Sequence, residues 1–275
     1  MLAGALSSAV ANLFVASLVL AGLAIYLTLI RQISARRTTT PDVTTGAAPA
    51  RTFGLPETFL AAVLILFLLF NITAAVGRSP VQLRSRDLIA NLLLTLFVVF
   101  LIAAFLKLRG IDIDALAGFS KASLKRAVST AIILLLAAAP LIALAEGLTQ
   151  SIFGSGSSKQ EIVDLFNTSR TIGQRVMIIV LAVVVAPISE EFIFRFFIYG
   201  VLRRYFGIAV GLVFNAVLFA AAHTHLPSAA PLFVLGTCFT LAYEWSGSIL
   251  VSMAMHALFN SAQLVLLAFP ELVQQ

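Results

Sequence analysis

Charged residues are scarce in this chain. Only 11% of its 275 residues are Asp, Glu, Lys or Arg, whereas an ordinary soluble domain carries about 25%. Hydrophobic residues make up 60% of the chain and the mean hydropathy is +1.05. The composition therefore excludes an ordinary soluble domain and predicts a polytopic membrane protein.

Several chemical signatures are also missing. Cysteine occurs once, as Cys238, so neither an intrachain disulfide nor a zinc site built from several cysteines can form. The chain contains no Gly-x-Ser-x-Gly and no His-Glu-x-x-His, which removes two common hydrolase signatures. The net charge of +6 comes without a basic run carrying interleaved aromatics, so we expect no nucleic-acid partner.

Long apolar runs are abundant. About 20 apolar residues cross the hydrocarbon core of a bilayer, and on this basis we predict an all-α transmembrane bundle of about eight spans. They lie near residues 7–30, 58–76, 88–106, 126–146, 175–198, 207–225, 229–245 and 248–269. The first run has no basic start and is too long for a signal peptide, so we interpret it as an anchor.

The chain divides into three regions in this interpretation. Residues 1–57 form an N-terminal anchor and polar linker, residues 58–174 form membrane spans with an amphipathic connection, and residues 175–270 form a helical core. The linker, 31–57, is polar and contains Pro and Gly. The connection has apolar residues at near-helical spacing in 159–170, which predicts a helix lying on the membrane surface.

Basic residues indicate the orientation, because cytoplasmic loops carry more Lys and Arg. With eight spans, the loops on one side of the membrane hold eleven basic residues, so we expect that side to be cytoplasmic. They are Arg31, Arg36, Arg37, Arg51, Lys107, Arg109, Lys121, Lys125, Arg126, Arg203 and Arg204. The opposite loops hold six: Arg78, Arg84, Arg86, Lys159, Arg170 and Arg175. We expect a multi-pass protein of the bacterial inner membrane, with both termini outside.

Ionisable residues inside the last spans are the most informative feature. At bilayer depth such groups cost several kcal/mol, at least about 2.5 to 3.5, so they are rare and usually functional. Glu191 and Arg195 are four residues apart and can pair on one helix face. Glu190 points about 100° away and has no partner three or four residues on, so it remains available as a general base. Pro187, just before, predicts a helix bend or start.

Two further pairs share the same spacing of four. Phe219 and His223 lie on one face of the sixth span, and His256 and Asn260 lie on one face of the last. An imidazole with an amide suits stabilisation of a developing oxyanion. Glu190, His223 and His256 offer an alternative, a divalent metal such as zinc held by two imidazoles and a carboxylate. The span boundaries place His223 toward the opposite membrane face from Glu190 and His256, which implies a shifted, tilted or broken helix.

The three motifs in this order, Glu-Glu-x-x-x-Arg at 190–195, Phe-x-x-x-His at 219–223 and His-x-x-x-Asn at 256–260, resemble the CPBP family of intramembrane proteases. That family includes Rce1-type CAAX prenyl endopeptidases and abortive-infection or bacteriocin-immunity proteins. The resemblance covers about 185–260. Phe196 departs from it, since members often carry Gly after the Arg.

The resemblance implies that Glu190 and His223 activate water, and that His256 and Asn260 form the oxyanion site. Glu191, Arg195 and Phe219 would support them. The expected function is an intramembrane endopeptidase acting on a peptide or protein substrate at the membrane, either glutamate-dependent or metal-dependent. A non-catalytic immunity or scaffold protein remains an alternative. An ion-coupled transporter is a third, disfavoured because no inverted repeat is evident.

Overall fold

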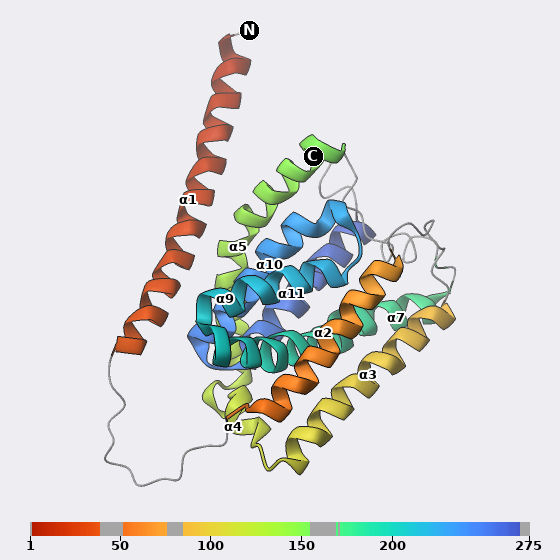
Figure 1. Ribbon diagram of the computed structural model, residues 1–275. Coiled ribbons are helices and arrows are strands. Elements are labelled where there is room, and N and C mark those ends of the chain that lie inside the picture. Colours follow the sequence, from red (N-terminus) through yellow and green to blue (C-terminus); the bar gives the residue numbers. More distant parts are fainter. Residues whose placement is uncertain (1, 39–51, 76–84, 155–168, 170, 270–275) are drawn as a thin grey trace.

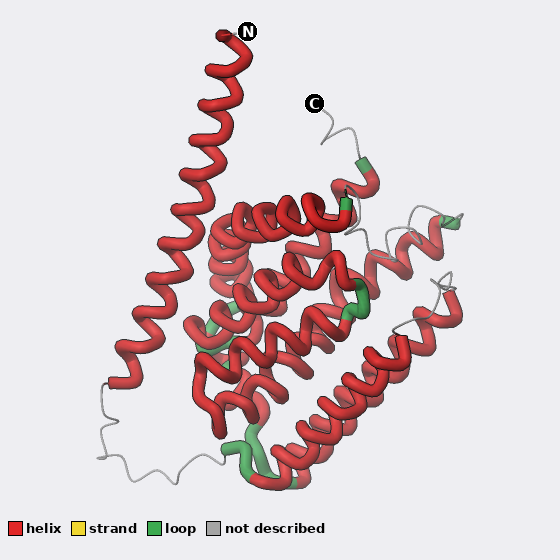
Figure 2. The backbone as a smooth tube through the Cα atoms, turned by 45° about the horizontal axis from the view of Figure 1, so that its top comes forward, coloured by secondary structure: helices red, strands yellow, loops and turns green. Residues whose placement is uncertain are grey.

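The computed structural model describes residues 2–38, 52–75, 85–154, 169 and 171–269, and every regular element in them is a helix (Figure 1). Figure 2 shows short loops joining the helices in this part of the chain. A helix satisfies its backbone N–H and C=O groups internally, as hydrocarbon requires. The predicted all-α transmembrane class is confirmed.

The long helices are α1 (Leu2–Thr38), α2 (Leu55–Ala75), α3 (Ser85–Leu108), α5 (Leu124–Phe153), α9 (Tyr199–Ala222), α10 (Ala229–Ser246) and α11 (Ile249–Ala268). From Ile172 to α9 the chain is helical through α7 (Ile172–Val180), η2 (Leu181–Val185), α8 (Ala186–Glu190) and η3 (Glu191–Ile198). Three short elements complete the described fold: α4 (Ile113–Ala117), η1 (Phe119–Lys121) and η4 (Leu226–Ser228).

The described residues contain seven helical segments long and apolar enough to cross a membrane. One of them, Ile172–Ala222, has 51 residues and would measure about 77 Å if straight, far more than a hydrocarbon core of about 30 Å. Gly207 interrupts it with a non-helical backbone (φ 80°, ψ 174°), and Gly211 lies against the backbone of Arg203. The segment therefore folds back on itself and contains both the fifth and the sixth predicted spans. The protein is an integral, multi-pass membrane protein.

Helix α1 extends beyond the predicted span of 7–30 at both ends and projects past the other helices (Figure 1). Its second half is the half that packs: Tyr26, Leu29 and Ile33 are buried, whereas Leu13 and Phe14 are exposed. The Tyr26 hydroxyl donates to the Leu134 carbonyl of α5 at 2.9 Å. Part of the predicted linker (39–51) and the amphipathic connection (159–168 and 170) lie outside the described residues.

Contacts gather several basic side chains at one end of the bundle. Arg36 of α1 donates to the Trp245 carbonyl at 2.7 Å, and Arg203 pairs with Glu244 at 2.8 Å. The Lys121 side chain lies beside Gly247, which follows α10. These three cations belong to the group that the sequence assigns to the cytoplasmic side, and we call this end the basic end.

Packing of α1 on α5 depends on Gly22, because a Cβ there would overlap the Ala137 carbonyl oxygen and lie 3.4 Å from Pro140 Cγ. We predict that Gly22→Ala lowers the free energy of unfolding by about 1–3 kcal/mol. Thermal unfolding of the purified protein in detergent measures this.

Gly147→Ala is the matched control, since Gly147 is also helical and a Cβ there meets nothing within 4 Å. This control should be neutral or stabilising by up to about 1 kcal/mol. Equal destabilisation by both substitutions would contradict the α1–α5 contact.

Candidate active site

The hairpin at Gly207 brings the first two polar motifs to one depth. Glu190 lies 17 residues before Gly207 and His223 lies 16 residues after it, so both are about equally far from the bend. The rings of Phe194 and Phe219 confirm this register with a centroid separation of 5.4 Å. The mismatch in depth that follows from the span boundaries is thereby resolved.

A second hairpin, at Gly247, supplies the third motif. Gly247 has a left-handed backbone (φ 66°, ψ 15°), and α10 and α11 run antiparallel on either side of it (Figure 1). Phe239 lies eight residues before this bend and His256 lies nine residues after it. Their rings stack with centroids 5.0 Å apart. His256 also lies edge-on to Phe219 of α9, at 6.0 Å. The three motifs therefore meet around Phe219.

A fully buried ionic network joins the first motif to the third. Glu191 and Arg195 have no exposed side-chain surface, and Arg195 Nη1 lies 2.9 Å from Glu191 Oε1. His256 Nδ1 lies 3.0 Å from the same oxygen. The predicted Glu191–Arg195 pair is thus present, and it has a partner on α11 that the sequence did not reveal.

The network also indicates the tautomer of His256. A carboxylate oxygen only accepts hydrogen bonds, so Nδ1 carries the proton that it donates to Glu191. In the neutral ring, Nε2 is then left without a proton. That nitrogen faces Glu190, whose Oε2 lies 3.9 Å away.

Aromatic rings surround the buried guanidinium. Its Cζ lies 4.0 Å from the centroid of Phe219 and 5.2 Å from that of Phe239, and Nη2 donates to the Gly236 carbonyl at 3.5 Å. A Cβ at position 236 would lie 3.0 Å from Phe219 Cδ1 and 3.4 Å from Arg195 Nη2, so a larger residue there would require the ring or the guanidinium to shift. Cation–π attraction is strongest where water is excluded, which is the case at Arg195.

Glu190 differs from Glu191 as the sequence predicts. Its side chain keeps 27% of its surface exposed, yet Oε2 is buried and has no hydrogen-bond partner among the described residues. A buried carboxylate oxygen without a donor is costly. This oxygen lies 3.9 Å from His256 Nε2, and a polar ligand or water could supply the hydrogen bond that it lacks.

The remaining predicted residues have partners of their own. His223, which directly follows α9, donates from Nδ1 to the Phe219 carbonyl at 2.9 Å, because a carbonyl can only accept; its Nε2 is then an acceptor. Asn260 Nδ2 donates to the Ala182 carbonyl in η2 at 2.8 Å. Its amide carries two N–H groups, so one remains for a ligand. No hydrogen bond links His223 to Glu190 in the described part of the chain.

Two π-helical turns shape the helix that carries the carboxylates. The N–H of Ala186 bonds to the Leu181 carbonyl at the end of η2, and that of Tyr199 bonds to the Phe194 carbonyl at the end of η3. Pro187 lacks an N–H and would crowd a regular α-helix, and the wider turn of η2 precedes it. Such π-turns are frequent at functional sites, and here they flank Glu190.

A preassembled metal centre is not evident in the described residues, where no group of three or more His, Cys, Asp and Glu could hold an ion. Glu190 and His256 approach each other, but His223 is hydrogen-bonded to Phe219. The metal alternative at Glu190, His223 and His256 stays a prediction.

Three contributors to the site were not identified from the sequence: Phe239, Gly236 and the Ala182 carbonyl. Phe239 and Gly236 lie on α10, which carries none of the motifs. Phe196, at the position where the resembled family often has Gly, packs its ring 5.0 Å from that of Phe192 and 5.7 Å from that of Phe53. The departure therefore affects local packing next to the site.

Comparison with protein-family models gives one match: residues 172–262 match the type II CAAX prenyl endopeptidase Rce1-like family. The matched segment runs from α7 into α11 and contains all three motifs. Searches among curated proteins and among solved structures give no match. The resemblance stated from the motifs is confirmed.

We predict that Arg195→Met lowers the free energy of unfolding by about 3–5 kcal/mol, because it leaves the buried Glu191 carboxylate without its counter-ion. Thermal unfolding in detergent measures the loss. Arg126→Met is the control, since Arg126 is exposed and should change stability by less than about 0.5 kcal/mol. A wild-type melting curve for Arg195→Met would refute the structural importance of this ion pair.

Proposed function

Because residues 172–262 match the Rce1-like family, we propose that the protein is an intramembrane endopeptidase that hydrolyses a peptide bond at or in the membrane. The family establishes the coarser character, a membrane-embedded hydrolase of the CAAX protease type. The observation that supports the finer proposal is the partly exposed Glu190 side chain, whose Oε2 lies 3.9 Å from His256 Nε2 and has no hydrogen-bond partner in the described chain. Glu191 Oε2 also lacks such a partner, but the Glu191 side chain is fully buried. A general base needs such a position, close to a polar group and open to a water molecule.

In this mechanism Glu190 and His223 hold and deprotonate water. Glu190 accepts the proton, and His223 orients the water through Nε2, the nitrogen that its bond to Phe219 leaves as an acceptor. The resulting hydroxide attacks the peptide carbonyl carbon. The proton then passes from Glu190 to the departing amine, so the carboxylate is regenerated as the peptide bond breaks.

His256 and Asn260 stabilise the oxyanion of the tetrahedral intermediate. Asn260 uses the amide hydrogen that does not bind Ala182. His256 must donate from Nε2, and because Nδ1 already donates to Glu191, this role requires the doubly protonated ring. The Glu191 carboxylate compensates that positive charge and fixes the ring plane, as a buried carboxylate does for the histidine of a catalytic triad.

We predict that Glu190→Gln lowers kcat by about 10²–10⁴-fold, since an amide cannot accept the proton from water, and that His223→Ala lowers it to a similar degree. Cleavage of a quenched membrane-anchored peptide library by the purified protein measures both effects. Asp114→Asn is the matched carboxyl-to-amide control, because Asp114 is exposed on α4.

Glu190→Gln should keep its melting temperature, because Oε2 loses no partner within the described chain. Retained cleavage by folded Glu190→Gln would refute the role of Glu190 as base. Failure of every form, wild type included, to cleave any library peptide would favour the scaffold alternative.

Asn260→Ala should lower kcat by about 10²–10³-fold with little change in KM, because the oxyanion exists only after substrate has bound. Ser261→Ala is the control, since Ser261 is the next residue and its hydroxyl bonds within α11 to the Ala257 carbonyl at 2.7 Å. A rise in KM at constant kcat would instead assign Asn260 to ground-state binding.

The same assays with a chelator address the metal alternative. Chelator-resistant cleavage would support the glutamate-dependent route. Loss of activity that added zinc restores would assign Glu190, His223 and His256 as metal ligands, and it would replace the water-activation step proposed above.

A further inference from the structure

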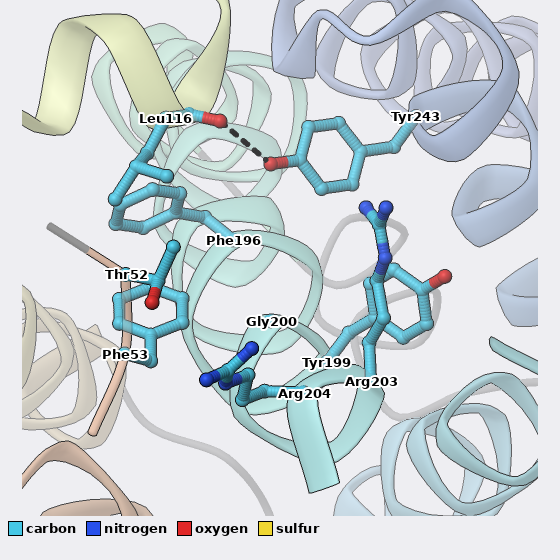
Figure 3. Close-up of a pocket in the computed structure, with 9 residues that line it drawn as sticks. All are labelled: Thr52, Phe53, Leu116, Phe196, Tyr199, Gly200, Arg203, Arg204 and Tyr243. Atoms are coloured by element: carbon cyan, nitrogen blue, oxygen red, sulfur yellow. Dashed lines mark hydrogen bonds between the residues drawn. The ribbon is translucent and has the colours of Figure 1, made fainter. Parts of the chain in front are cut away.

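A concave site lies at the basic end of the bundle, and neither Glu190 nor Glu191 lines it. It is a cavity of about 390 Å³ between the segment before α2, α4, η3, the start of α9 and the end of α10. Figure 3 shows Arg203 and Arg204 directed into this space, with Tyr199 and Tyr243 beside them and Phe53 and Phe196 opposite. We call it the arginine pocket.

Its apolar side is built by close packing. Phe53 is buried and meets Phe196 and Phe197 edge-on, with centroids 5.7 and 5.9 Å apart. A Cβ at Gly200 would overlap the Phe53 ring, so glycine at this position permits the ring to lie against the helix. One side of the pocket is therefore a fixed aromatic surface.

Its polar side carries uncompensated positive charge. Arg203 Nη1 forms an ion pair with Glu244, and Glu244 also accepts a hydrogen bond from the Tyr199 hydroxyl at 2.9 Å. The Tyr243 hydroxyl donates to the Leu116 carbonyl at 3.2 Å. The exposed Arg204 side chain has no ion-pair or hydrogen-bond partner within the described chain. A guanidinium offers five donors in a planar fork that matches phosphate oxygens, so Arg204 and the unused donors of Arg203 form an anion site.

The position of the pocket favours a membrane lipid as the molecule that carries the bound anion. The pocket lies at the basic end, near Arg36, Lys121 and Arg203. Basic residues are in excess on the cytoplasmic side of membrane proteins, and the cytoplasmic leaflet carries anionic lipids. Basic pockets between transmembrane helices on this side bind the headgroups of anionic lipids. We propose that the arginine pocket binds the phosphate headgroup of an anionic phospholipid, with Arg204 as its principal ligand and the aromatic surface against the adjoining glycerol and acyl carbons.

A carboxylate at the end of a peptide substrate fits less well. Arg204 follows Glu190 by 14 residues of nearly continuous helix, about 21 Å at 1.5 Å per residue. An extended peptide covers about 3.4 Å per residue, so roughly six residues would have to separate the cleaved bond from the carboxylate. A lipid has no such requirement, and its binding is independent of the proposed protease activity.

The test measures melting temperature of the delipidated protein in neutral detergent. Dioleoylphosphatidylglycerol, dioleoylphosphatidylcholine and inorganic phosphate are titrated in separate arms. At a hundredfold excess over Kd, the anionic lipid should raise Tm by about 5 °C. Arg204→Gln should weaken its binding about tenfold, as loss of a charge-assisted hydrogen bond does, whereas Arg126→Gln should retain wild-type affinity.

Four outcomes would overturn the proposal. Equal shifts with both lipids, or an undiminished shift in Arg204→Gln, would show that this pocket does not select an anionic headgroup. An equal shift with inorganic phosphate alone would show a phosphate site that does not require lipid. A KM raised by Arg204→Gln only for peptides with a free terminal carboxylate, in lipid-free detergent, would reassign the pocket to substrate.

Arg204→Lys provides a second variant. Arg204 is exposed, so this substitution should leave the protein folded, and because it retains the charge we expect an affinity for the anionic lipid between those of the wild type and Arg204→Gln.

Discussion

One oxygen atom, Oε1 of Glu191, connects the helices that form the site. It accepts from Arg195 four residues along its own helix and from His256 on α11, and all three side chains are buried. In a medium of low dielectric constant, each of these polar groups is expensive alone. The cost is offset only when η3 and α11 adopt the one separation that lets both donors reach the oxygen. Fold and site geometry are thus constrained by the same contact.

Phe219 has a comparable function among the apolar residues. Its ring contacts the Arg195 guanidinium, the His223 ring and the His256 ring, and Phe239 completes the enclosure from α10. Gly236 leaves the space in which ring and guanidinium meet. Because interiors are close-packed, the polar network and the aromatic residues around it form one unit, and substitutions within it should not be independent.

Features governed by spacing along one helix could be predicted from the sequence. The Glu191–Arg195 pair, the separate environment of Glu190 and the local disturbance at Pro187 follow from helix geometry and proline stereochemistry. The number of crossings also followed from apolar run length, once Gly207 is recognised as a bend. Relations between helices could not be predicted in the same way. The partners of His256 and Asn260 depend on where each hairpin turns and on the π-turns that shift the register, and no local pattern encodes either. The arginine pocket is assembled from segments far apart in the sequence, so the sequence identified Arg203 and Arg204 only as basic residues of a loop.

The side chains of Glu190 and Glu191 are unequally exposed, so the site is open on one side and closed on the other. Glu191, Arg195 and His256 are buried beside aromatic rings, whereas Glu190 keeps 27% of its side-chain surface exposed and His223 and Asn260 are only partly buried. In the described chain the cluster is therefore open on the side of Glu190, and the proposed mechanism requires both water and substrate to reach it from an open side. If Glu190 is the base, the hydrolytic water must be in place before the chain covers it. Each catalytic cycle then has a fixed order, in which the site refills with water before the next chain binds.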